Sequence, residues 1–355
     1  MLVRTVLLFP VKNIYIFFFL NLQVILWQPV VVENIKKDRE VHFYVRASSI
    51  NSIKAQLRQL TIQYKVSMED VQGLIEKQII NDTVNPRRSS SYYENYHSMK
   101  EIYHWMEEVV KVHSDLLQKI YIGSSYEKRP LYVLKVHQEK RKSAIWIDCG
   151  IHAREWISPA FCLWFIGHNR LWRKSRSSHG NSKCIGTDMN RNFDAHWCGE
   201  GASPYECQET YCGPYPESEP EVKAVARFVR DHKDIIKAYI TMHSYSQLVL
   251  FPYSYTMDRS KDHDELESLA KKAAKAIKRT TKKTYRLGAG AQTIYLAPGG
   301  SDDWAYDLGI KYSFTFELRD TGTYGFLLPP QEIKPTCLEA LSAVKEISQH
   351  VLQNL

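Results

Sequence analysis

The seven cysteines of this 355-residue chain include no Cys-x-x-Cys pair, so neither a zinc knuckle nor a thioredoxin-type redox site is indicated. No internal repeat and no stripe of basic and aromatic residues is present, which argues against nucleic-acid binding. The hydrophobic stretch from Ile14 to Leu22 is too short for a transmembrane helix, so we expect no stable membrane insertion. The net charge of +8 is spread out, and its densest run, residues 271–283, has the spacing of a solvated helix face rather than a polyanion site.

What is present is the composition of a globular protein, with 44% hydrophobic and 24% charged residues. The length allows one large domain and a smaller one. The cysteines fit three disulfides and one free thiol in a secreted protein. Six of them lie in two clusters and the seventh stands apart: Cys149 and Cys162, then Cys184, Cys198, Cys207 and Cys212, and finally Cys337.

The N-terminal part divides into a leader, a compact segment and a linker. Residues 1–27 resemble a secretory leader with a short hydrophobic region, but no small-x-small cleavage site follows it. Beyond it, the patterns predict a strand over 40–48 and helices over 49–60 and 68–79. Residues 81–91 then combine proline, paired arginine and a serine run, which is typical of an exposed linker.

Two features of this linker carry functional predictions. Asn81 begins the only glycosylation sequon, which matters only outside the cytosol. Arg87 and Arg88 offer a cleavage site to a trypsin-like protease, and the alternative is a charged linker without a further role.

From residue 92 onward, predicted helices and strands alternate, which favours an α/β fold with a central sheet covered by helices on both faces. The predicted strands are residues 131–136, 144–149, 235–244 and 312–319. The predicted helices are residues 157–168, 219–232, 266–280 and 338–355.

A histidine and a glutamate with metal-ligand spacing follow the predicted strand at residues 144–149, in the stretch GIHAREWIS. With 13 histidines in the chain, a His-x-x-Glu pair is expected about once by chance. His104 and Glu107 form such a pair on an amphipathic helix, and we interpret that pair as surface. His152 and Glu155 instead lie after the C-terminal end of an apolar strand, where open α/β sheets build their sites.

Two further residues complete a candidate catalytic metal site. His243 ends another apolar strand and is the expected third ligand of a His₂Glu zinc site, although a lone histidine there is commonly a core residue. Glu317 lies within an apolar strand, where an unpaired carboxylate is costly. It is a candidate general base, and the structural alternative is an ion pair with Arg319.

Several long motifs occur in a fixed order: HAREWISPA, RLWRK, DMNRNFDAHW, MHSYSQ and IYLAPGGSDDWAYDLGIKYSFTFELRDTGTYGFLLP. Together they resemble the zinc metallocarboxypeptidases of the pancreatic A/B type, from about Val30 to the C-terminus. The resemblance implies an α/β fold with a mixed central sheet, preceded by a small α+β propeptide domain. It divides the chain into an atypical leader over 1–27, a truncated activation propeptide over 28–87 and a catalytic domain over 88–355.

The resemblance also assigns roles to individual residues. It implies one Zn²⁺ held by His152, Glu155 and His243, with Glu317 as general base and Arg173 stabilising the oxyanion. The substrate-binding residues that it implies are Arg154, Asn190, Arg191 and Tyr295. A planar guanidinium binds a carboxylate bidentately, as an enzyme that recognises a free C-terminus requires.

Specificity, activation and disulfide pairing follow from the same resemblance. Asp302 stands where B-type enzymes have aspartate, so we expect peptide and protein substrates with C-terminal Lys or Arg, and an A-type enzyme is disfavoured. Cleavage by a trypsin-like protease is expected at Arg87 or Arg88. The implied disulfides are Cys149–Cys162, Cys184–Cys207 and Cys198–Cys212, with Cys337 free.

The chain departs from the family in two places. Residues 165–168 are followed directly by residues 169–172. In the family, a long segment lies between these two stretches, and it includes a buried strand of the central sheet. Loss of that strand would leave two neighbouring strands unpaired, at a cost beyond a single cavity of about 2–5 kcal/mol. The hydrophobic leader also replaces the first strand and helix of the propeptide. The alternative hypothesis is therefore an inactive or misfolded deletion variant that acts at most as a binding protein.

Overall fold

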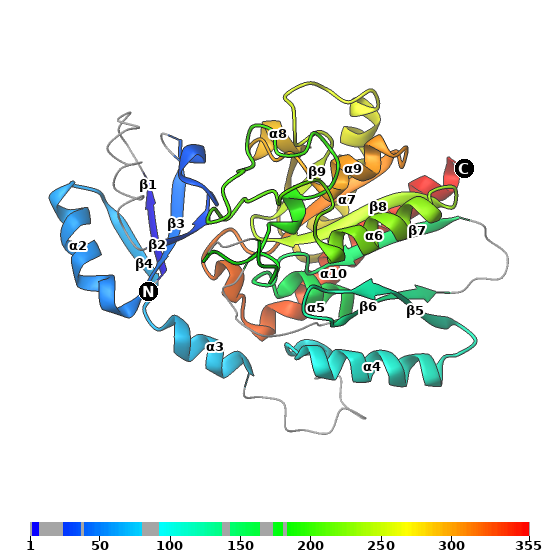
Figure 1. Cartoon of the computed structure of the whole chain (residues 1–355), viewed down its shortest axis with the longest axis horizontal. Coiled ribbons are helices and arrows are strands. Elements are labelled where there is room, and N and C mark those ends of the chain that lie inside the picture. Colours follow the sequence, from blue (N-terminus) through cyan, green and yellow to red (C-terminus); the bar gives the residue numbers. More distant parts are fainter. Residues whose placement is uncertain are drawn as a thin grey trace.

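The computed structural model describes residues 2–6, 24–36, 39–79, 92–136, 143–163, 173–179 and 183–354. An N-terminal unit and a larger catalytic unit lie side by side (Figure 1). Within the described residues, no helix has both the length and the apolar character needed to cross a membrane. Asn81, Arg87, Arg88 and the junction at 165–172 lie outside the described residues.

The N-terminal unit is a four-stranded sheet with two helices, in the strand order β2-β3-β1-β4. Its elements are β1 (Leu2–Val6), β2 (Val24–Gln28), β3 (Glu40–Val45), α2 (Ile50–Gln59), β4 (Tyr64–Met68) and α3 (Val71–Ile79). Alternate residues of β3 form its core with α2, since Val41, Phe43 and Val45 are buried against Ile53 and Leu57. The predicted strand and both predicted helices are confirmed. Strand β1, and β2 except for Gln28, come from the expected leader, and both strands pair with β3.

The catalytic unit is built on a five-stranded mixed sheet in the order β10-β9-β11-β8-β7. These strands are β7 (Ala144–Cys149), β8 (Ile236–Ser244), β9 (Leu248–Phe251), β10 (Arg286–Ala289) and β11 (Tyr312–Leu318). Parallel pairing joins β7 to β8 and β8 to β11, whereas β9 is antiparallel to β11. The mixed central sheet is as predicted.

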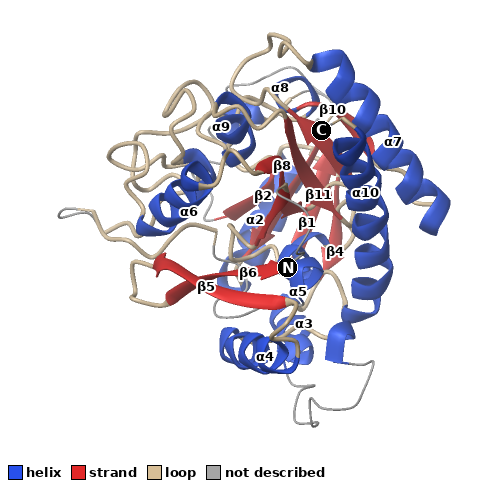
Figure 2. Cartoon of the chain, turned by 90° about the vertical axis from the view of Figure 1, so that its right-hand side faces the viewer, coloured by secondary structure: helices blue, strands red, loops and turns tan. Residues whose placement is uncertain are grey.

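Helices cover both faces of this sheet, as predicted (Figure 2). One hydrophobic cluster joins the sheet to α5 (Ile157–Leu163), α7 (His263–Thr281) and α10 (Ile333–Gln353). A second cluster joins its other face to α6 (Pro220–Asp231) and α9 (Ser301–Asp307). The short helix α8 (Gly290–Thr293) follows β10.

A separate two-stranded sheet, β5 (Leu117–Ser124) with β6 (Pro130–Val136), completes the unit together with α4 (Met99–Val112). Helix α4 begins at a capping box in which Ser98 and Glu101 bond to each other's backbone N–H groups. His104 on this helix is exposed, and Glu107 contacts Lys119 at 3.3 Å. This pair is a surface pair, as predicted.

Among the described residues, no strand joins β6 to β7. Within the described residues, β7 pairs only with β8, and β6 pairs only with β5. No residue of β7 is buried, whereas β8 is buried along nearly its whole length. This arrangement agrees with the expectation that a lost strand leaves two strands without a neighbour.

The three disulfides pair as expected: Cys149–Cys162, Cys184–Cys207 and Cys198–Cys212. Cys337 is free and buried, and burial raises the pKa of its thiol. A thiol in this state is a poor nucleophile.

Candidate metal centre and active site

The loop after β7 and the end of β8 bring the three predicted metal ligands together. His152 and Glu155 follow the end of β7, and His243 is the penultimate residue of β8. Because β7 and β8 are parallel neighbours with Cys149 opposite Met242, their C-terminal ends meet at one edge of the sheet. One ligand atom from each of the three buried residues lies within 4.8 Å of the others.

Within this cluster, both histidines direct Nδ1 at the same carboxylate. His152 Nδ1 lies 2.8 Å from Oε1 of Glu155, and His243 Nδ1 lies 3.0 Å from Oε2. Burial alone would raise the pKa of Glu155, but the two imidazoles hold it below its ordinary value. Burial alone would lower the pKa of His243, but Glu155 raises it to about 9. The site therefore stabilises positive charge between the three side chains.

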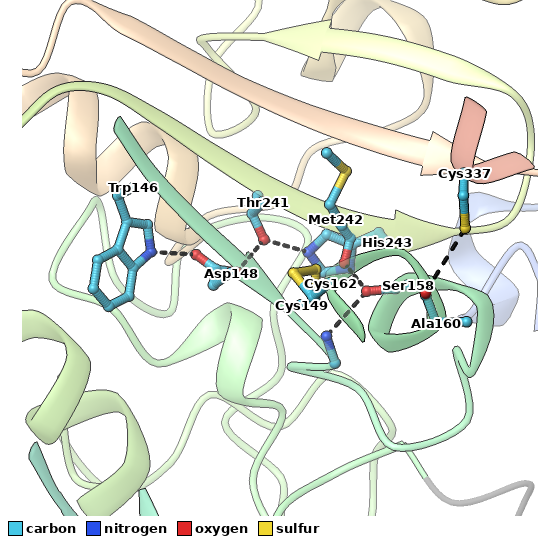
Figure 3. Close-up of a disulfide and its surroundings, with 11 residues drawn as sticks. Trp146, Asp148, Cys149, Ser158, Ala160, Cys162, Thr241, Met242, His243 and Cys337 are labelled. Carbon is cyan, nitrogen blue, oxygen red and sulfur yellow. Dashed lines mark hydrogen bonds between the residues drawn. A yellow bond between two sulfur atoms is a disulfide. The ribbon is translucent and has the colours of Figure 1, made fainter. Parts of the chain in front are cut away.

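The other ring nitrogen of each histidine is held by a partner that fixes the ring. His152 Nε2 lies 2.9 Å from the Asp188 carboxylate, which only accepts hydrogen bonds when it is ionised. His243 Nε2 lies 3.2 Å from Oγ1 of Thr241, whose hydroxyl donates to Asp148 at 2.6 Å (Figure 3). Both Nε2 atoms are therefore donors, which leaves Nδ1 of each ring as the nitrogen that binds a metal.

A serine also fixes the two loops relative to each other. Ser158 at the start of α5 accepts a hydrogen bond from the Gly150 N–H at 3.0 Å and donates one to the carbonyl of Met242 (Figure 3). It thereby joins the loop after β7 to the residue that precedes His243.

Asp188 was not predicted, and it connects the metal ligands to Arg173. Arg173 donates to Oδ2 of Asp188 from Nε at 3.0 Å and from a terminal nitrogen at 2.7 Å. Burial would raise the pKa of Asp188, but Arg173 and His152 hold it well below its ordinary value. Asp188 thus orients a metal ligand with one oxygen and the predicted oxyanion-binding arginine with the other.

Glu317 lies next to the metal ligands because of strand register. In the parallel pair of β8 and β11, Glu317 is directly opposite His243. Its side chain is half-buried, and burial raises the pKa of its carboxyl to about 8. The alternative, an ion pair between Glu317 and Arg319, is wrong, because Arg319 instead bonds to Glu332 and Glu339.

One pocket contains the metal ligands together with most of the predicted substrate-binding residues. Its lining includes His152, Glu155, His243, Glu317, Arg173, Asn190, Arg191, Tyr295 and Asp302. Arg154 is not among the lining residues: it is fully buried, 4.4 Å from the centroid of the Phe326 ring and 3.7 Å from a Glu209 oxygen.

Asp302 is buried at the start of α9, with 4% of its surface exposed, and lines the same pocket. Thr315 Oγ1 donates to one carboxylate oxygen at 2.8 Å. Its neighbour Asp303 faces away and accepts two backbone N–H groups, of Ser254 and Tyr255. The sequence predicted that Asp302, rather than Asp303, determines the specificity for the terminal residue of the substrate. Of the two aspartates, only Asp302 lines the pocket.

The N-terminal unit covers the pocket, a feature that sequence reasoning missed. Residues 27–30 line it from outside the catalytic unit. Gln28 donates to Ser246 at 3.0 Å, and the ring centroid of Trp27 lies 5.0 Å from that of Phe326. His42 contributes a further contact, with Nδ1 at 2.8 Å from the Tyr245 hydroxyl.

The donor set suits zinc. Two imidazoles, each held by a second partner, and one carboxylate form the ligand set of catalytic zinc sites that leave one position for substrate or water. The chemistry of the donor set therefore supports the predicted cofactor.

Comparisons with known proteins agree with this site. The model of the zinc carboxypeptidase family matches residues 102–168 and 167–343, and that of the carboxypeptidase activation peptide matches 19–78. The chain belongs to the zinc carboxypeptidase family, as its motifs suggested. It is 58% identical to carboxypeptidase B2 of Rattus norvegicus and 56% identical to that of Homo sapiens, with 94% of this chain and 88% of each relative aligned.

A comparison with solved structures agrees with this family membership. The crystal structure of thrombin activatable fibrinolysis inhibitor (TAFI) superposes with a TM-score of 0.96 at 50% identity. The superposition covers 100% of this chain and 99% of that chain.

The comparisons also indicate a missing segment. The alignment to the Rattus norvegicus relative spans 373 positions, more than the 355 residues of this chain, so the relative has residues that this chain lacks. The family model matches in two pieces that meet at residues 167–168. The missing segment therefore falls between α5 and Arg173, as the sequence suggested.

Proposed function

We propose that this chain is the secreted zymogen of a zinc metallocarboxypeptidase that removes C-terminal Lys and Arg from peptides and proteins. The observation that carries the proposal is the single pocket in which Asp302 lies with His152, Glu155 and His243. Family membership supports the metallocarboxypeptidase class, and the three disulfides support an extracellular location.

In the proposed mechanism, one Zn²⁺ held by His152, Glu155 and His243 supplies Lewis acidity when it is bound. Glu317 takes a proton from the attacking water and returns it to the leaving amine. A carboxylate beside the ligands is suited to both transfers. Arg173 stabilises the negative charge that develops on the carbonyl oxygen, which is typically worth about 3–4 kcal/mol.

Substrate recognition uses the other residues of the pocket. Asn190, Arg191 and Tyr295 bind the terminal carboxylate of the substrate, and guanidinium geometry supports Arg191 as the main contact. Asp302 pairs with the cationic side chain of a terminal Lys or Arg. An apolar terminal residue would leave this buried carboxylate without a counter-charge, so the enzyme discriminates against it.

The N-terminal unit keeps the uncleaved chain inactive. Residues 27–30 form part of the wall of the pocket, which supports a role in blocking the access of substrate to the pocket. We propose that a trypsin-like protease releases this unit at Arg87 or Arg88. Because the chain resembles carboxypeptidase B2 and thrombin activatable fibrinolysis inhibitor, partly degraded fibrin is a proposed protein substrate.

A second candidate function is binding of C-terminal Lys or Arg peptides without turnover. The observation that favours it is the interrupted sheet between β6 and β7, which the described residues do not bridge. In this case zinc and peptide would bind, but the reacting groups would not be held in a productive geometry.

Hydrolysis of two matched peptides tests the proposal. After trypsin treatment, a peptide that ends in arginine should be cleaved about 100-fold faster, in kcat/KM, than the same peptide ending in phenylalanine. Asp302→Ala should abolish that preference, whereas Asp258→Ala, at an exposed loop position, should retain it. Equal rates for both peptides with the unchanged chain would refute B-type specificity. Peptide binding without turnover would support the second candidate.

A further inference from the structure

Helix α7 carries a dense run of basic residues on its exposed side. Between Ser268 and Ser301 the chain has eight lysines and arginines and no aspartate or glutamate. The leucines, the isoleucine and most alanines of α7 are buried against the sheet, and the basic residues occupy the exposed positions, as the sequence predicted for a solvated helix face. We call the following exposed residues the basic face: Lys271, Lys272, Lys275, Lys278, Arg279 and Lys282.

The fold uses few of these charges. Lys271 pairs with Glu267 at 2.8 Å, and the other members of the basic face have no salt-bridge partner in the described part of the chain. Cations in the last turn of a helix offset its macrodipole, which accounts for Lys278 and Arg279. This effect is confined to the last turn, so it does not account for the lysines that precede it.

Helix α10 lies beside α7 and runs antiparallel to it (Figure 2). The Thr281 hydroxyl at the end of α7 donates to Glu339 in the first half of α10. Glu265 at the start of α7 contacts His350 near the end of α10 at 3.3 Å. Both helices pack on the same face of the central sheet through one hydrophobic cluster. Their outer faces therefore form one continuous surface.

The outer face of α10 contributes apolar side chains to this surface. Leu338, Leu341 and Leu352 are 47%, 58% and 44% exposed. At 3.6 residues per turn, their spacing places all three on one side of the helix, which they share with the exposed Lys345. We call the three leucines the leucine stripe. Single exposed leucines are ordinary, but a row of them beside unpaired cations indicates a partner that is both anionic and apolar.

We propose that the basic face and the leucine stripe bind the surface of an anionic lipid bilayer, with both helices lying along the membrane and no segment crossing it. The lysines pair with the anionic headgroups, and the leucines enter the boundary between headgroups and acyl chains. A sulfated polysaccharide would match the charge of the basic face but would offer no apolar surface to the leucines. The combination therefore favours a bilayer.

Sedimentation of the full-length chain with lipid vesicles tests this proposal. The vesicles contain equal parts of phosphatidylserine and phosphatidylcholine, or phosphatidylcholine alone. We expect binding to the anionic vesicles only, and weaker binding as the salt concentration rises. Lys275→Gln combined with Lys278→Gln should lower the partition coefficient about 30-fold, because each lysine at an anionic surface contributes about fivefold. Leu338→Gln combined with Leu341→Gln should lower it about tenfold, because less apolar surface is buried.

The matched control removes two positive charges from the other face of the sheet. Lys223 on α6 and Lys233 just after it are exposed, and Lys223→Gln combined with Lys233→Gln should retain vesicle binding. Equal loss of binding in this control would show a general attraction of a cationic chain and would overturn the proposal. Vesicle binding that survives either the lysine pair or the leucine pair would also overturn it.

Two further measurements complete the test. Binding to dextran sulfate without binding to anionic vesicles would show that the surface recognises a polyanion, and would overturn the proposal. All substituted side chains are exposed, so the variants should keep the melting temperature of the unchanged chain. Lys272→Gln combined with Arg279→Gln is the second lysine-to-glutamine type of variant if the first pair fails to fold. Binding is measured without peptide substrate, so a failure of the proposed enzyme function would be seen separately.

Discussion

Asp188 connects two parts of the active site through one carboxylate, with His152 on one oxygen and Arg173 on the other. Asp188→Asn keeps the shape of the side chain and removes its charge. We expect zinc affinity to fall about 10- to 100-fold, because the partner that orients a ligand histidine is weakened. Competition with a chromogenic chelator measures this affinity. Asp194→Asn, at an exposed position nearby, is the matched control, and an unaltered zinc affinity in Asp188→Asn would contradict the assignment.

Glu317 is assigned to proton transfer rather than to metal binding. Glu317→Gln should therefore lower kcat by about 10²- to 10⁴-fold while the zinc content stays the same. Steady-state kinetics and metal analysis on the same preparation separate these two effects. The exposed Glu200→Gln should behave as the unchanged chain. Loss of zinc from Glu317→Gln would show that this carboxylate has a different role.

At the residue scale, the sequence predicted the ligands and missed their partners. His152, Glu155 and His243 were predictable because the first two follow an apolar strand and His243 lies at the end of another, and parallel strands bring their C-terminal ends together. Asp188 and Thr241 were not predictable, because a single loop aspartate or strand threonine has no pattern that identifies its distant partner. The role of Arg154 remains a prediction, since its guanidinium lies beneath Phe326 rather than at the pocket surface.

At the scale of elements, strand β2 and the residues after it form the cover of the pocket. Trp27 is 2% exposed and packs on Phe326, and removal of a buried aromatic side chain costs about 3–5 kcal/mol. Trp27→Ala should therefore raise the activity of the uncleaved chain toward a short peptide. Leu60→Ala, in the same unit but 38% exposed, should not. After trypsin treatment both variants should match the unchanged chain, and a difference that persists would place the effect in the catalytic unit.

Helices α7 and α10 and strand β11 are joined by Glu265, which contacts Lys311, Tyr312 and His350. The pKa of Glu265 is lowered to about 2, and the hydrogen bond from Lys311 makes the largest contribution to this shift. A carboxyl whose folded pKa is depressed stabilises the fold above its ordinary pKa, 4.5 for this glutamate, and this contribution is lost as the pH falls toward 2. Glu265→Gln should thus lower the free energy of unfolding at pH 7, and by less at pH 3.

Urea denaturation at these two pH values measures the effect of Glu265→Gln. Because Glu265 is partly exposed, solvent screening keeps the difference small. Asp264→Asn, whose side chain is 91% exposed, is the control at the neighbouring position. A difference that grows toward low pH would contradict the sign of this linkage.

Strand composition predicted β7, β8 and β11 of the central sheet, and periodicity predicted its long helices, whereas the short strands β9 and β10 were not predicted. The leader was the least predictable region. Residues 2–6 and 24–28 form strands that pair with β3, and this pairing depends on partners distant in sequence. The cover of the pocket was missed for the same reason, since Trp27 lies at the end of a stretch that reads as a secretory leader. Whether that leader directs secretion stays a prediction.

At the scale of the whole molecule, the central claim is that a shortened chain still forms a working catalytic centre. The named site residues of the pocket are present and adjacent, while no strand in the described part of the chain joins β6 to β7. The ligands come from β7 and β8, whose mutual pairing is intact. The energetic cost of the interruption therefore falls on β6 and on the outer edge of β7, away from the metal ligands.

The most direct test measures bound zinc and turnover on one preparation of the secreted chain, before and after trypsin. The account predicts one zinc per chain throughout, together with hydrolysis of an arginine-terminated peptide that rises sharply after cleavage at Arg87 or Arg88. Chelation of the zinc should abolish that hydrolysis, and added zinc should restore it. Folded protein that binds no zinc, or that binds zinc and remains inactive after complete cleavage, would contradict the account.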